Sequence, residues 1–504
     1  MKFKSKIGII GISLLAFACT DLEITDRDYL LGSEYPENAE QALRVSTPVF
    51  AGTQPMLDNG GWWFTQEITS DEAVAPTRGS DWDDSGKWRQ LSRHTWTPTT
   101  DAIIQLYRMI YTSIPRANRA IELLKEGAEA NPAVQQVLAQ TEVSRAYYFY
   151  LAMDNFGDIS FPRTFTGADE FPARTPRAEV FKQLVADVEG AIPYLADPVA
   201  GASASAINKG TAYALLAKLY LNAEVYTGTP MWQKASDACD KVIGMGYQLE
   251  ASPLASFKTA NETSKENIYT IAYDQDAFKG FNLHMRTLHG LSQLTFGMST
   301  APWNGFATLE AHYNTFQSTD LRKNMLLVGQ QYTVAGDAIN DPAADGAPLV
   351  FTPFIPELQM SNSVYSSAVV KMSGVRVAKW QVAPGAKENL SNDFAIFRLA
   401  DIILMKAEAL VRLNGAGAGD ALVNQIRSRA EVPQLSGYTL TAILAERGRE
   451  LMWEGHRRQD LIRFGKYTGI WWEKTDTDPN RNIFPIPEFA YLANKNLLPQ
   501  NPGY

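Results

Sequence analysis

Tryptophan side chains are concentrated in one short part of the sequence, and their chemistry suggests carbohydrate binding. The stretch from Trp62 to Trp96 holds five of the 11 tryptophans in the chain, where average usage would place about one. A flat indole can stack on the C–H patches of a sugar ring. Neighbouring carboxylates, amides and guanidinium groups can then bind the ring hydroxyls.

Within this stretch, the segment "TRGSDWDDSGKW" is polar and is predicted to be a loop. Trp82 and Trp88 have no apolar neighbours along the chain there, so we expect both rings to be exposed. Arg78, Asp81 and Asp83 flank Trp82 and are candidates for binding sugar hydroxyls. Trp82 is therefore the first candidate for a stacking residue, and Trp88 is the second.

Two other segments carry candidate ligand residues outside the tryptophan-rich stretch. In "STAPWNGF", Trp303 and Asn304 lie between a proline and a glycine in an irregular region, and Arg376 lies in "GVRVAKW". The alternative for each tryptophan is packing within a capping loop, because tryptophan is highly buried on average. Trp96, which precedes "TPTT" and a predicted helix, is better explained as a packing anchor.

Carboxylates that could catalyse glycoside hydrolysis are also present. A helical glycoside hydrolase is therefore the main alternative to a binding protein without catalysis. Such an enzyme needs two carboxylates about 5 to 10 Å apart in a cleft. The acidic candidates are Asp81, Asp83, Asp84, Glu446, Glu450 and Glu454. The last three repeat at four-residue spacing on one predicted helix that also carries four arginines. That pattern predicts a charge network that stays ionised, and we expect no catalysis.

Metal, cofactor and nucleophile motifs give no alternative chemistry. The five histidines are His94, His284, His289, His312 and His456. They form no HExxH motif, and they are predicted to lie in loops or in the core. The sequence contains neither a GxSxG elbow nor a GxxxxGK[ST] phosphate loop. We therefore expect neither a metal nor a cofactor.

The N-terminal residues have the layout of a bacterial export signal. Lys2, Lys4 and Lys6 precede an apolar run of about a dozen residues, which is too short to span a bilayer as a helix. The run ends in "LLAFACTD", which resembles a lipobox. We expect residues 1–18 to be removed and Cys19 to become the acylated first residue. The alternative is an ordinary signal peptide with a chance cysteine.

Composition limits the partners of the mature chain. The formal charge of the full chain is −9, and loss of three signal-peptide lysines would make it −12. With no long basic block, this charge argues against nucleic acid as a partner. Hydrophobic residues make up 45% of the chain and charged residues 20%, as in folded proteins.

Cys239 lies in a helix-like stretch, and we expect a reduced, packed thiol there.

The elements that must position these candidates are mainly α-helical. Apolar residues recur at steps of three and four across residues 103–246, and helix pairs of similar length predict tetratricopeptide-like hairpins within residues 30–250. Pro115 is expected to bend or restart the first helix. Residues 251–504 are predicted to be loop-rich, with short strands, C-terminal helices and an extended tail.

A tetratricopeptide-like groove would also allow a peptide-binding adaptor. The inner positions that can be inferred are tyrosine, alanine and leucine, whereas peptide grooves usually carry basic and asparagine residues. We therefore expect these helices to pack against the second half of the protein and to act as a scaffold.

Several stretches, in order along the chain, resemble the SusD/RagB family of surface glycan-binding lipoproteins of Bacteroidota. They are "SRAYYFYLAMDNFGDISFP", "TPRAEVFKQLVADVEGAIPYL", "NKGTAYALLAKLYLNAEVY", "FRLADIILMKAEAL", "VNQIRSRAEVP", "ERGRELMWEGHRRQDLIRFG" and "FPIPEFAYLANKNLLPQNPGY". The resemblance implies a single unit over residues 19–504, with a tetratricopeptide scaffold and a loop-rich second half. It also implies a lipid-anchored protein on the outer face of the outer membrane. Such a protein would pass oligosaccharides, without catalysis, to a SusC-like TonB-dependent transporter.

Overall fold

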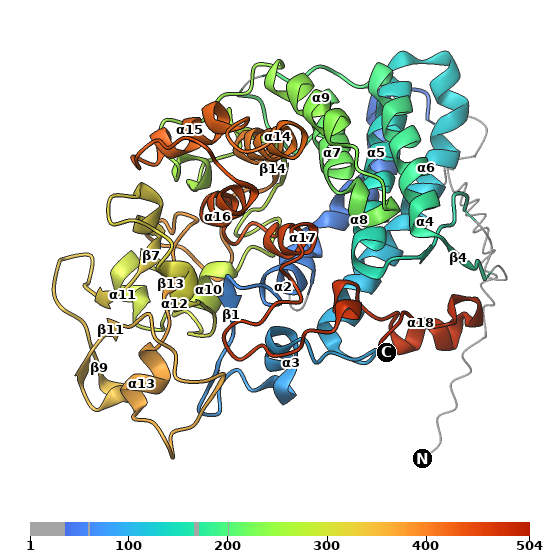
Figure 1. The fold of residues 1–504 in the computed structure, drawn as a ribbon. Helices are drawn as coiled ribbons and strands as arrows, with labels where there is room; N and C mark the ends of the chain where they lie inside the picture. The colour runs from blue at the N-terminus through green and yellow to red at the C-terminus, as the bar shows by residue number, and fades with distance from the viewer. Residues whose placement is uncertain (1–35, 59–60, 166–170, 200) are drawn as a thin grey trace, which may run out of the picture. The chain divides into compact units, whose positions relative to one another are not determined.

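Packed helices form most of the first half of the described chain (Figure 1). The computed structural model describes residues 36–58, 61–165, 171–199 and 201–504, so the predicted signal peptide and Cys19 lie outside the described residues. The helices of this half are α4 (Asp101–Ala130), α5 (Pro132–Phe156), α6 (Arg177–Ala191), α7 (Lys209–Leu221), α8 (Ala223–Thr227) and α9 (Trp232–Ile243). Successive long helices pack on one another, α4 on α5, α5 on α6, α6 on α7 and α7 on α9. The mainly α, tetratricopeptide-like architecture predicted from sequence is confirmed.

Capping residues fix the ends of these helices. Asn131 alone separates α4 from α5, and its side chain accepts a hydrogen bond from the Ala133 N–H, with Pro132 in the first helical position. Gly157 ends α5 with a φ of 75°. A residue with a side chain rarely adopts this conformation, so glycine suits the helix end.

Pro115 does not restart α4, which is continuous from Asp101 to Ala130. The proline removes one backbone donor. It lies on the exposed side, while the opposite side of the helix is buried against α5. Burial along the whole helix outweighs one missing hydrogen bond, so the expected restart is wrong.

The segment before α4 is more helical than the sequence indicated. α1 (Ala39–Phe50) and the 3-10 helix η1 (Ala51–Leu57) pack on α4, and α1 also packs on α5. A Cβ on Gly52 would lie 2.5 Å from both the Ser113 and Tyr148 hydroxyls, so only glycine allows this approach. α2 (Trp62–Glu67) follows, and both of its tryptophans are buried.

The second half is built from short strands and short helices, as predicted. Its longest sheet pairs β5 (Asn267–Ile271) with β14 (Phe394–Arg398) in antiparallel register. Strands of the second half also pair β1 (Ala73–Val74) with β6 (Ala307–Thr308), β2 (Thr77–Arg78) with β12 (Gln359–Met360), β7 (Leu326–Leu327) with β13 (Arg376–Val377), β8 (Gly329–Gln330) with β11 (Val350–Phe351), and β9 (Asn340–Asp341) with β10 (Ala347–Pro348). Its short helices are α10 (Leu283–Thr287), α11 (Ser292–Phe296), α12 (Glu310–Tyr313) and α13 (Ser367–Met372). The first half contributes the pair β3 (Ile159–Ser160) with β4 (Arg174–Thr175) and the short helix α3 (Lys87–Arg93). All of the pairs are antiparallel except β2 with β12.

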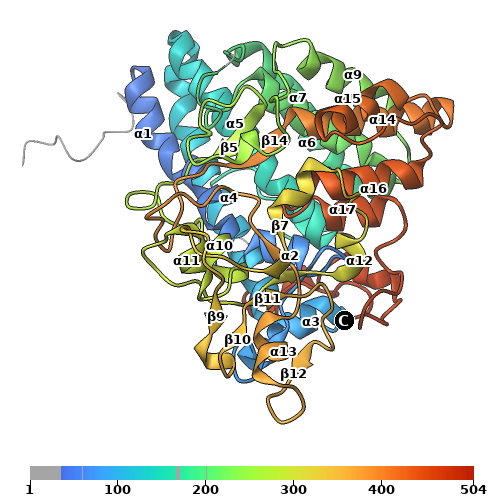
Figure 2. The same ribbon diagram turned by 90° about the vertical axis from the view of Figure 1, so that its left-hand side faces the viewer.

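The C-terminal helices return to the first half of the fold (Figure 2). They are α14 (Leu399–Asn414), α15 (Asp420–Arg429), α16 (Leu440–Leu451), α17 (Arg457–Arg463) and α18 (Glu488–Ala493). α14 packs against α7 and α9, which joins the two halves. The tail is not wholly extended as expected, because α18 forms directly after Pro487, which is its N-cap residue.

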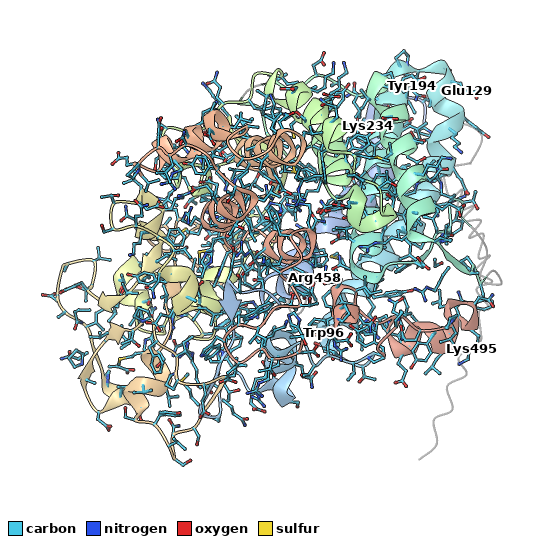
Figure 3. All side chains as sticks on the ribbon, viewed as in Figure 1. Trp96, Glu129, Tyr194, Lys234, Arg458 and Lys495 are labelled. Carbon is cyan, nitrogen blue, oxygen red and sulfur yellow. The ribbon has the colours of Figure 1, made fainter. Side chains whose placement is uncertain are left out.

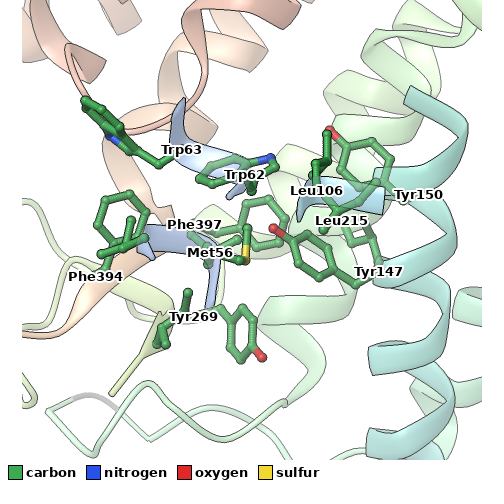
Figure 4. Packing of buried hydrophobic residues seen from close by; sticks show 14 of the residues in the cluster. Met56, Trp62, Trp63, Leu106, Tyr147, Tyr150, Leu215, Tyr269, Phe394 and Phe397 are labelled. Carbon is green, nitrogen blue, oxygen red and sulfur yellow. The ribbon is translucent and has the colours of Figure 1, made fainter. Parts of the chain in front are cut away.

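One hydrophobic core extends across both halves (Figure 4). Tyr147 of α5 and Leu215 of α7 pack in the same cluster as Phe394 and Phe397 of β14. The rings of Tyr147 and Phe397 are 6.2 Å apart. The helices therefore pack against the second half, as the scaffold interpretation predicted. Within residues 36–504, apart from the undescribed gaps, no helix is long and apolar enough to cross a membrane.

Two single-residue predictions are confirmed in the core. Cys239 is a buried free cysteine, and burial raises the pKa of its thiol. Trp96 is also buried, and its indole N–H donates a 2.6 Å hydrogen bond to the Tyr504 hydroxyl near the C-terminus (Figure 3). Trp96 is thus a packing anchor, as expected.

Candidate functional site

Residues from three distant segments meet in one cluster, which contains all the candidate ligand residues. The segments are residues 78–88, residues 302–306 and the region around Arg376. The Trp82 indole N–H donates to the Trp303 carbonyl at 3.0 Å. Arg376 donates to the Asn304 side chain at 2.9 Å. The sequence had placed these candidates in separate loops, and the fold brings them together.

Trp82 is fixed against the 302–306 loop. Its ring lies 5.1 Å from that of Phe306 and 6.3 Å from that of Trp88. A Cβ on Gly305 would overlap the Trp82 ring, so the indole can lie over this backbone only because residue 305 is glycine. Trp82 is half-buried. Part of its surface therefore remains open, while its orientation is set by the protein.

Trp303 provides the exposed aromatic surface of the cluster, with 37% of the residue accessible. Its backbone N–H donates to the Met285 carbonyl at 2.7 Å. The Arg286 guanidinium lies 5.3 Å from the centre of the Trp303 ring, within the range of a cation–π contact. The ring is thus positioned by α10, and much of it stays open to solvent. Trp82 and Trp303 together are called the tryptophan platform below.

Arg78 and Arg376 are buried, so the expectation that they contact a ligand is corrected. Arg78 is 4% exposed, and it donates to the carbonyls of Gly305 (3.1 Å), Val370 (2.8 Å) and Ser373 (2.9 Å). Burial lowers the pKa of Arg78 to about 9. Its guanidinium joins the loop carbonyls of Gly305 and Ser373 to the Val370 carbonyl near the end of α13, and it holds these segments in place.

Arg376 has the same role in the neighbouring loop. It is 0% exposed, and it donates to the carbonyls of Ser373 at 2.8 Å, Gly374 at 2.7 Å and Lys371 at 2.8 Å. Burial lowers its pKa well below the ordinary arginine value. Both arginines are therefore positioning residues beneath the tryptophan platform.

Trp88 is also buried, which corrects the expectation that its ring is exposed. It is 1% exposed, because residues 87–93 form α3 instead of a loop and pack the ring against Phe64 and Phe306. The indole N–H donates to the Asp84 carboxylate at 2.5 Å. Trp88 supports Trp82 from below and offers no open face to a ligand.

The polar candidates at the rim differ in how free they are to bind. Asp81 is exposed, and Asp83 is partly exposed and accepts a 2.7 Å hydrogen bond from Arg89. Asn304 uses its amide oxygen for Arg376 and its amide nitrogen for the Lys371 carbonyl. The two aspartates are therefore the better acceptors for sugar hydroxyls.

Unusual backbone conformations are concentrated at this cluster. Trp82, Asp84, Ser85 and Asn304 all have positive φ, at 61°, 40°, 54° and 56°. Such values are uncommon outside glycine, and for a residue as bulky as tryptophan they are outliers. Strained residues of this kind are characteristic of binding loops held by their surroundings.

Residues that the sequence did not indicate complete the site. Arg286 lies against Trp303, Arg89 binds Asp83, and Gly305 accommodates the Trp82 ring. The dipeptide Asn304–Gly305 was a turn signal that pointed to this loop. No sequence signal marked Arg286 or Arg89.

The acidic helix that suggested a hydrolase is buried and ion-paired. Glu446, Glu450 and Glu454 lie within α16 or just after it and are at most 3% exposed. Arg398 donates to Glu450 at 2.7 Å and to Glu454 at 2.6 Å. The pKa of each of these carboxyls lies below its ordinary value because of the neighbouring arginines and lysines, despite their burial. The predicted ionised charge network is confirmed, but the helix ends at Leu451, and Glu450 and Glu454 pair with Arg398 of β14 instead of with arginines of the same helix.

Burial raises the pKa of several other carboxyls, most strongly those of Glu67 and Glu72. The pKa of Glu67 rises to about 8 and that of Glu72 rises well above its ordinary value, in both cases mainly through desolvation. Raised values can mark a general acid. Both side chains are at most 1% exposed, however, so a substrate cannot reach them.

The histidines are core residues, as expected. All five are at most 5% exposed, and burial lowers the pKa of each. Across the described part of the chain, no group of three or more histidine, cysteine or acidic side chains is arranged to hold a metal ion.

Comparisons with known proteins give a consistent family assignment. A model described as the SusD family matches residues 243–504, and a model described as starch-binding associating with outer membrane matches residues 46–221. The starch-binding protein SusD of Bacteroides thetaiotaomicron is 24% identical over 84% of this chain and 82% of its own length.

Solved structures share the fold. A SusD superfamily protein from Parabacteroides distasonis superposes with a TM-score of 0.75 and 18% identity, over 92% of this chain and 99% of that one. A laminarin-binding SusD-like protein superposes with a TM-score of 0.72 and 23% identity, over 93% and 100%. Because the SusD family model matches more than half of the sequence, this chain belongs to the SusD family.

Proposed function

We propose that this protein captures oligosaccharides at the cell surface and passes them, without catalysis, to a SusC-like TonB-dependent outer-membrane transporter. The observation that carries the proposal is the tryptophan platform, in which Trp82 and Trp303 are held by hydrogen bonds and ring contacts while indole surface stays open. Such a preformed surface suits the C–H patches of a sugar ring, since little side-chain freedom is lost on binding. Asp81 and Asp83 supply acceptors for hydroxyls.

Family relatives support a glycan as the ligand. One relative is named for starch binding, and one protein of the same fold is described as laminarin binding. Both ligands are neutral polysaccharides, which the combination of open indoles and carboxylates would suit. The acidic net charge of −9 gives no support to nucleic acid as a partner.

The absence of catalysis is supported by the placement of the carboxyls. A glycosidase needs one carboxyl with a raised pKa beside the bound sugar. Burial raises the pKa of Glu67 and of Glu72, but both side chains are closed off from a substrate. Asp81 and Asp83, which are close to the tryptophan platform, lie at its solvent-accessible rim. Reducing ends released from starch or laminarin by the purified protein would overturn this element of the proposal.

Acylation of Cys19 would provide the attachment to the outer membrane. The "LLAFACTD" pattern supports it, and a single tether would leave the protein free to move over a transporter. Wild-type protein expressed in its host is expected to partition into detergent, whereas Cys19→Ala should stay in the aqueous phase. Partition of the variant into detergent would contradict lipidation. Copurification of a TonB-dependent barrel protein with this chain from solubilised membranes tests the proposed transporter partner.

Affinity electrophoresis through gels that contain starch or laminarin tests glycan binding. Retardation of the wild-type protein should be lost in Trp303→Ala and reduced in Trp82→Ala. Tyr332→Ala, which removes an exposed aromatic ring elsewhere in the loop-rich half, is the matched control and should behave as wild type. Equal retardation of the wild type and Trp303→Ala would reject the tryptophan platform as the site.

A further inference from the structure

We propose a second sugar-binding surface, formed by Trp472, Tyr365 and Glu357, that takes a distant part of the same polysaccharide chain. The inference rests on the proposed function and extends it, because it assigns the ligand to polymers long enough to reach two surfaces. Trp472 lies in the segment after α17, which passes beside α3 (Figure 1), and Glu357 and Tyr365 lie on either side of β12.

Trp472 is presented by a tight turn that the protein holds firmly. Trp471 and Lys474 exchange backbone hydrogen bonds of 3.2 and 3.0 Å, and Glu473 between them has a φ of 53°. The Glu473 carboxylate accepts from Arg93 at 2.5 Å and from the Leu358 N–H at 2.6 Å. Buried Lys474 donates to the Tyr467 carbonyl at 3.0 Å. The turn is therefore rigid without any contribution from Trp472.

The Trp472 side chain has no polar partner in this arrangement. Its ring is partly exposed, and Trp472 and Tyr365 both pack against the apolar cluster that contains Val74, Leu358 and Val370. Among the described residues, none accepts a hydrogen bond from its indole N–H. By contrast, the indole N–H groups of Trp82, Trp88 and Trp96 all donate within the protein. An aromatic face and a free donor are therefore available to a ligand.

Polar groups suited to sugar hydroxyls lie beside this aromatic pair. Glu357 precedes Leu358, whose N–H donates to the Glu473 carboxylate, and the side chains of Glu357 and Tyr365 are both partly exposed. A carboxylate has about four lone-pair positions, so Glu357 can accept hydrogen bonds from ligand hydroxyls. Two aromatic rings with an adjoining carboxylate repeat the chemistry of the tryptophan platform.

Backbone hydrogen bonds connect the two surfaces. Leu358 donates its N–H to Glu473, and its carbonyl accepts from the Thr77 N–H at 2.8 Å. Thr77 begins β2, which pairs with β12 and leads into the loop of Trp82. The two surfaces are thus separate sites joined by a short run of hydrogen-bonded backbone. A polymer that occupies both gains from a high effective concentration, whereas a short oligosaccharide reaches only one.

Chain-length dependence of binding tests the second surface. Wild-type protein, Trp472→Leu and Trp472→Tyr would be titrated calorimetrically with starch and laminarin, and with the corresponding trisaccharides. Leucine keeps the apolar packing but removes the flat ring, and tyrosine restores a ring. We expect Trp472→Leu to weaken polymer binding about tenfold and to leave trisaccharide binding unchanged. Trp472→Tyr should recover most of the lost polymer binding. Glu357→Gln should give a smaller loss of the same kind.

The outcomes separate this inference from the proposed function. One outcome is that Trp303→Ala loses binding of polymer and trisaccharide while Trp472→Leu binds both as the wild type does. This outcome would overturn the second surface and leave the proposed function standing. Failure of the wild type to bind any of these glycans would contradict the proposed function and the second surface together. Unchanged polymer binding by Trp472→Leu with weaker copurification of the transporter would reassign the surface to a protein contact. Melting temperatures confirm that each variant is folded.

Discussion

The helical half and the loop-rich half satisfy their buried backbone groups in different ways. In α4 to α9 the peptide groups bind one another within each helix, and apolar side chains pack the helices together. In the loop-rich half most strands are only two residues long, so many carbonyls have no strand partner. Buried cations bind several of them. Arg78, Arg376 and Lys379 each donate to two or three carbonyls.

The difference shows how a loop region can be rigid without long regular elements. A guanidinium has five N–H donors in a fixed plane, so one side chain can tie several loop carbonyls together. The cost is desolvation of a charge, which other buried arginines offset by pairing with carboxylates, as Arg398 does with Glu266 at 2.8 Å. The loop-rich half should therefore depend on single polar residues, and the helical half on apolar volume.

The largest expected loss of stability comes from substitution of Arg398 in the loop-rich half. Arg398→Met would leave the buried carboxylates of Glu266, Glu450 and Glu454 without this partner. Removing one member of a buried charge network costs about 3 to 5 kcal/mol of unfolding free energy. Urea denaturation followed by tryptophan fluorescence measures the loss. Arg44→Met, which removes an exposed pair with Glu40, should cost less than about 1 kcal/mol. Equal costs for the two variants would contradict the comparison.

A smaller loss is expected when apolar volume is removed from the helical half. Leu184 of α6 is fully buried, and Leu184→Ala should lower the unfolding free energy by about 3 kcal/mol through lost burial and a cavity. Leu43→Ala on the exposed side of α1 is the control and should change stability by less than about 1 kcal/mol. Differential scanning calorimetry of both variants checks the difference. A smaller effect of Leu184→Ala than of Leu43→Ala would show that this core is loosely packed.

The pH dependence of stability tests the buried Glu67. Its pKa is about 8 in the folded protein and near 4.5 when exposed, because burial disfavours the charged carboxylate. Across that window the native state holds a proton that the unfolded state has lost, so stability falls as pH rises. Glu67→Gln should reduce the loss between about pH 6 and pH 8 by roughly 2 kcal/mol. Melting temperatures at both pH values measure it, and parallel curves for the two proteins would contradict the assignment.

Lowering the pH below about 6.5 should also lower the stability of the folded protein, because of its buried histidines. The five buried histidines have lowered pKa values, from about 6.5 to between about 3 and about 4. Below pH 6.5 the unfolded chain binds protons that these histidines do not, so stability falls as pH falls. Together with Glu67, they place the stability maximum near neutral pH.

Features of the fold and of the candidate site could be predicted from the sequence where the contacts that determine them lie between residues close together in the chain. The 3.6-residue period of α4 to α9 is a property of neighbouring residues, and it predicted the helical half. Trp88 was predicted wrongly because its ring is buried by Phe64 and Phe306, of which Phe306 lies more than two hundred positions away. Arg78 was misassigned for the same reason, since its carbonyl partners lie at Gly305, Val370 and Ser373. Nothing near either residue in the sequence reveals those partners.

The smallest effect on stability is expected at Gly305, where a substitution tests the orientation of the tryptophan platform. Gly305→Ala places a methyl group against the Trp82 ring and should push the indole away from the 302–306 loop. The half-buried ring can move, so we expect a stability loss of about 1 kcal/mol. Retardation in starch or laminarin gels should decrease several-fold. Ala301→Gly, an exposed change in the same loop, is the control. Full retention of binding by Gly305→Ala would show that the orientation of Trp82 is unimportant.

The hydrogen bond from the Trp82 indole to the Trp303 carbonyl has a consequence for selectivity. Because that N–H is occupied within the protein, Trp82 meets a ligand only through carbon atoms, which sense the flatness of a sugar and not the direction of its hydroxyls. Discrimination between epimers or linkages at this position must then come from the acidic rim. Exchanging Asp81 or Asp83 should change which glycans are preferred, while exchanging Trp82 should weaken all of them alike.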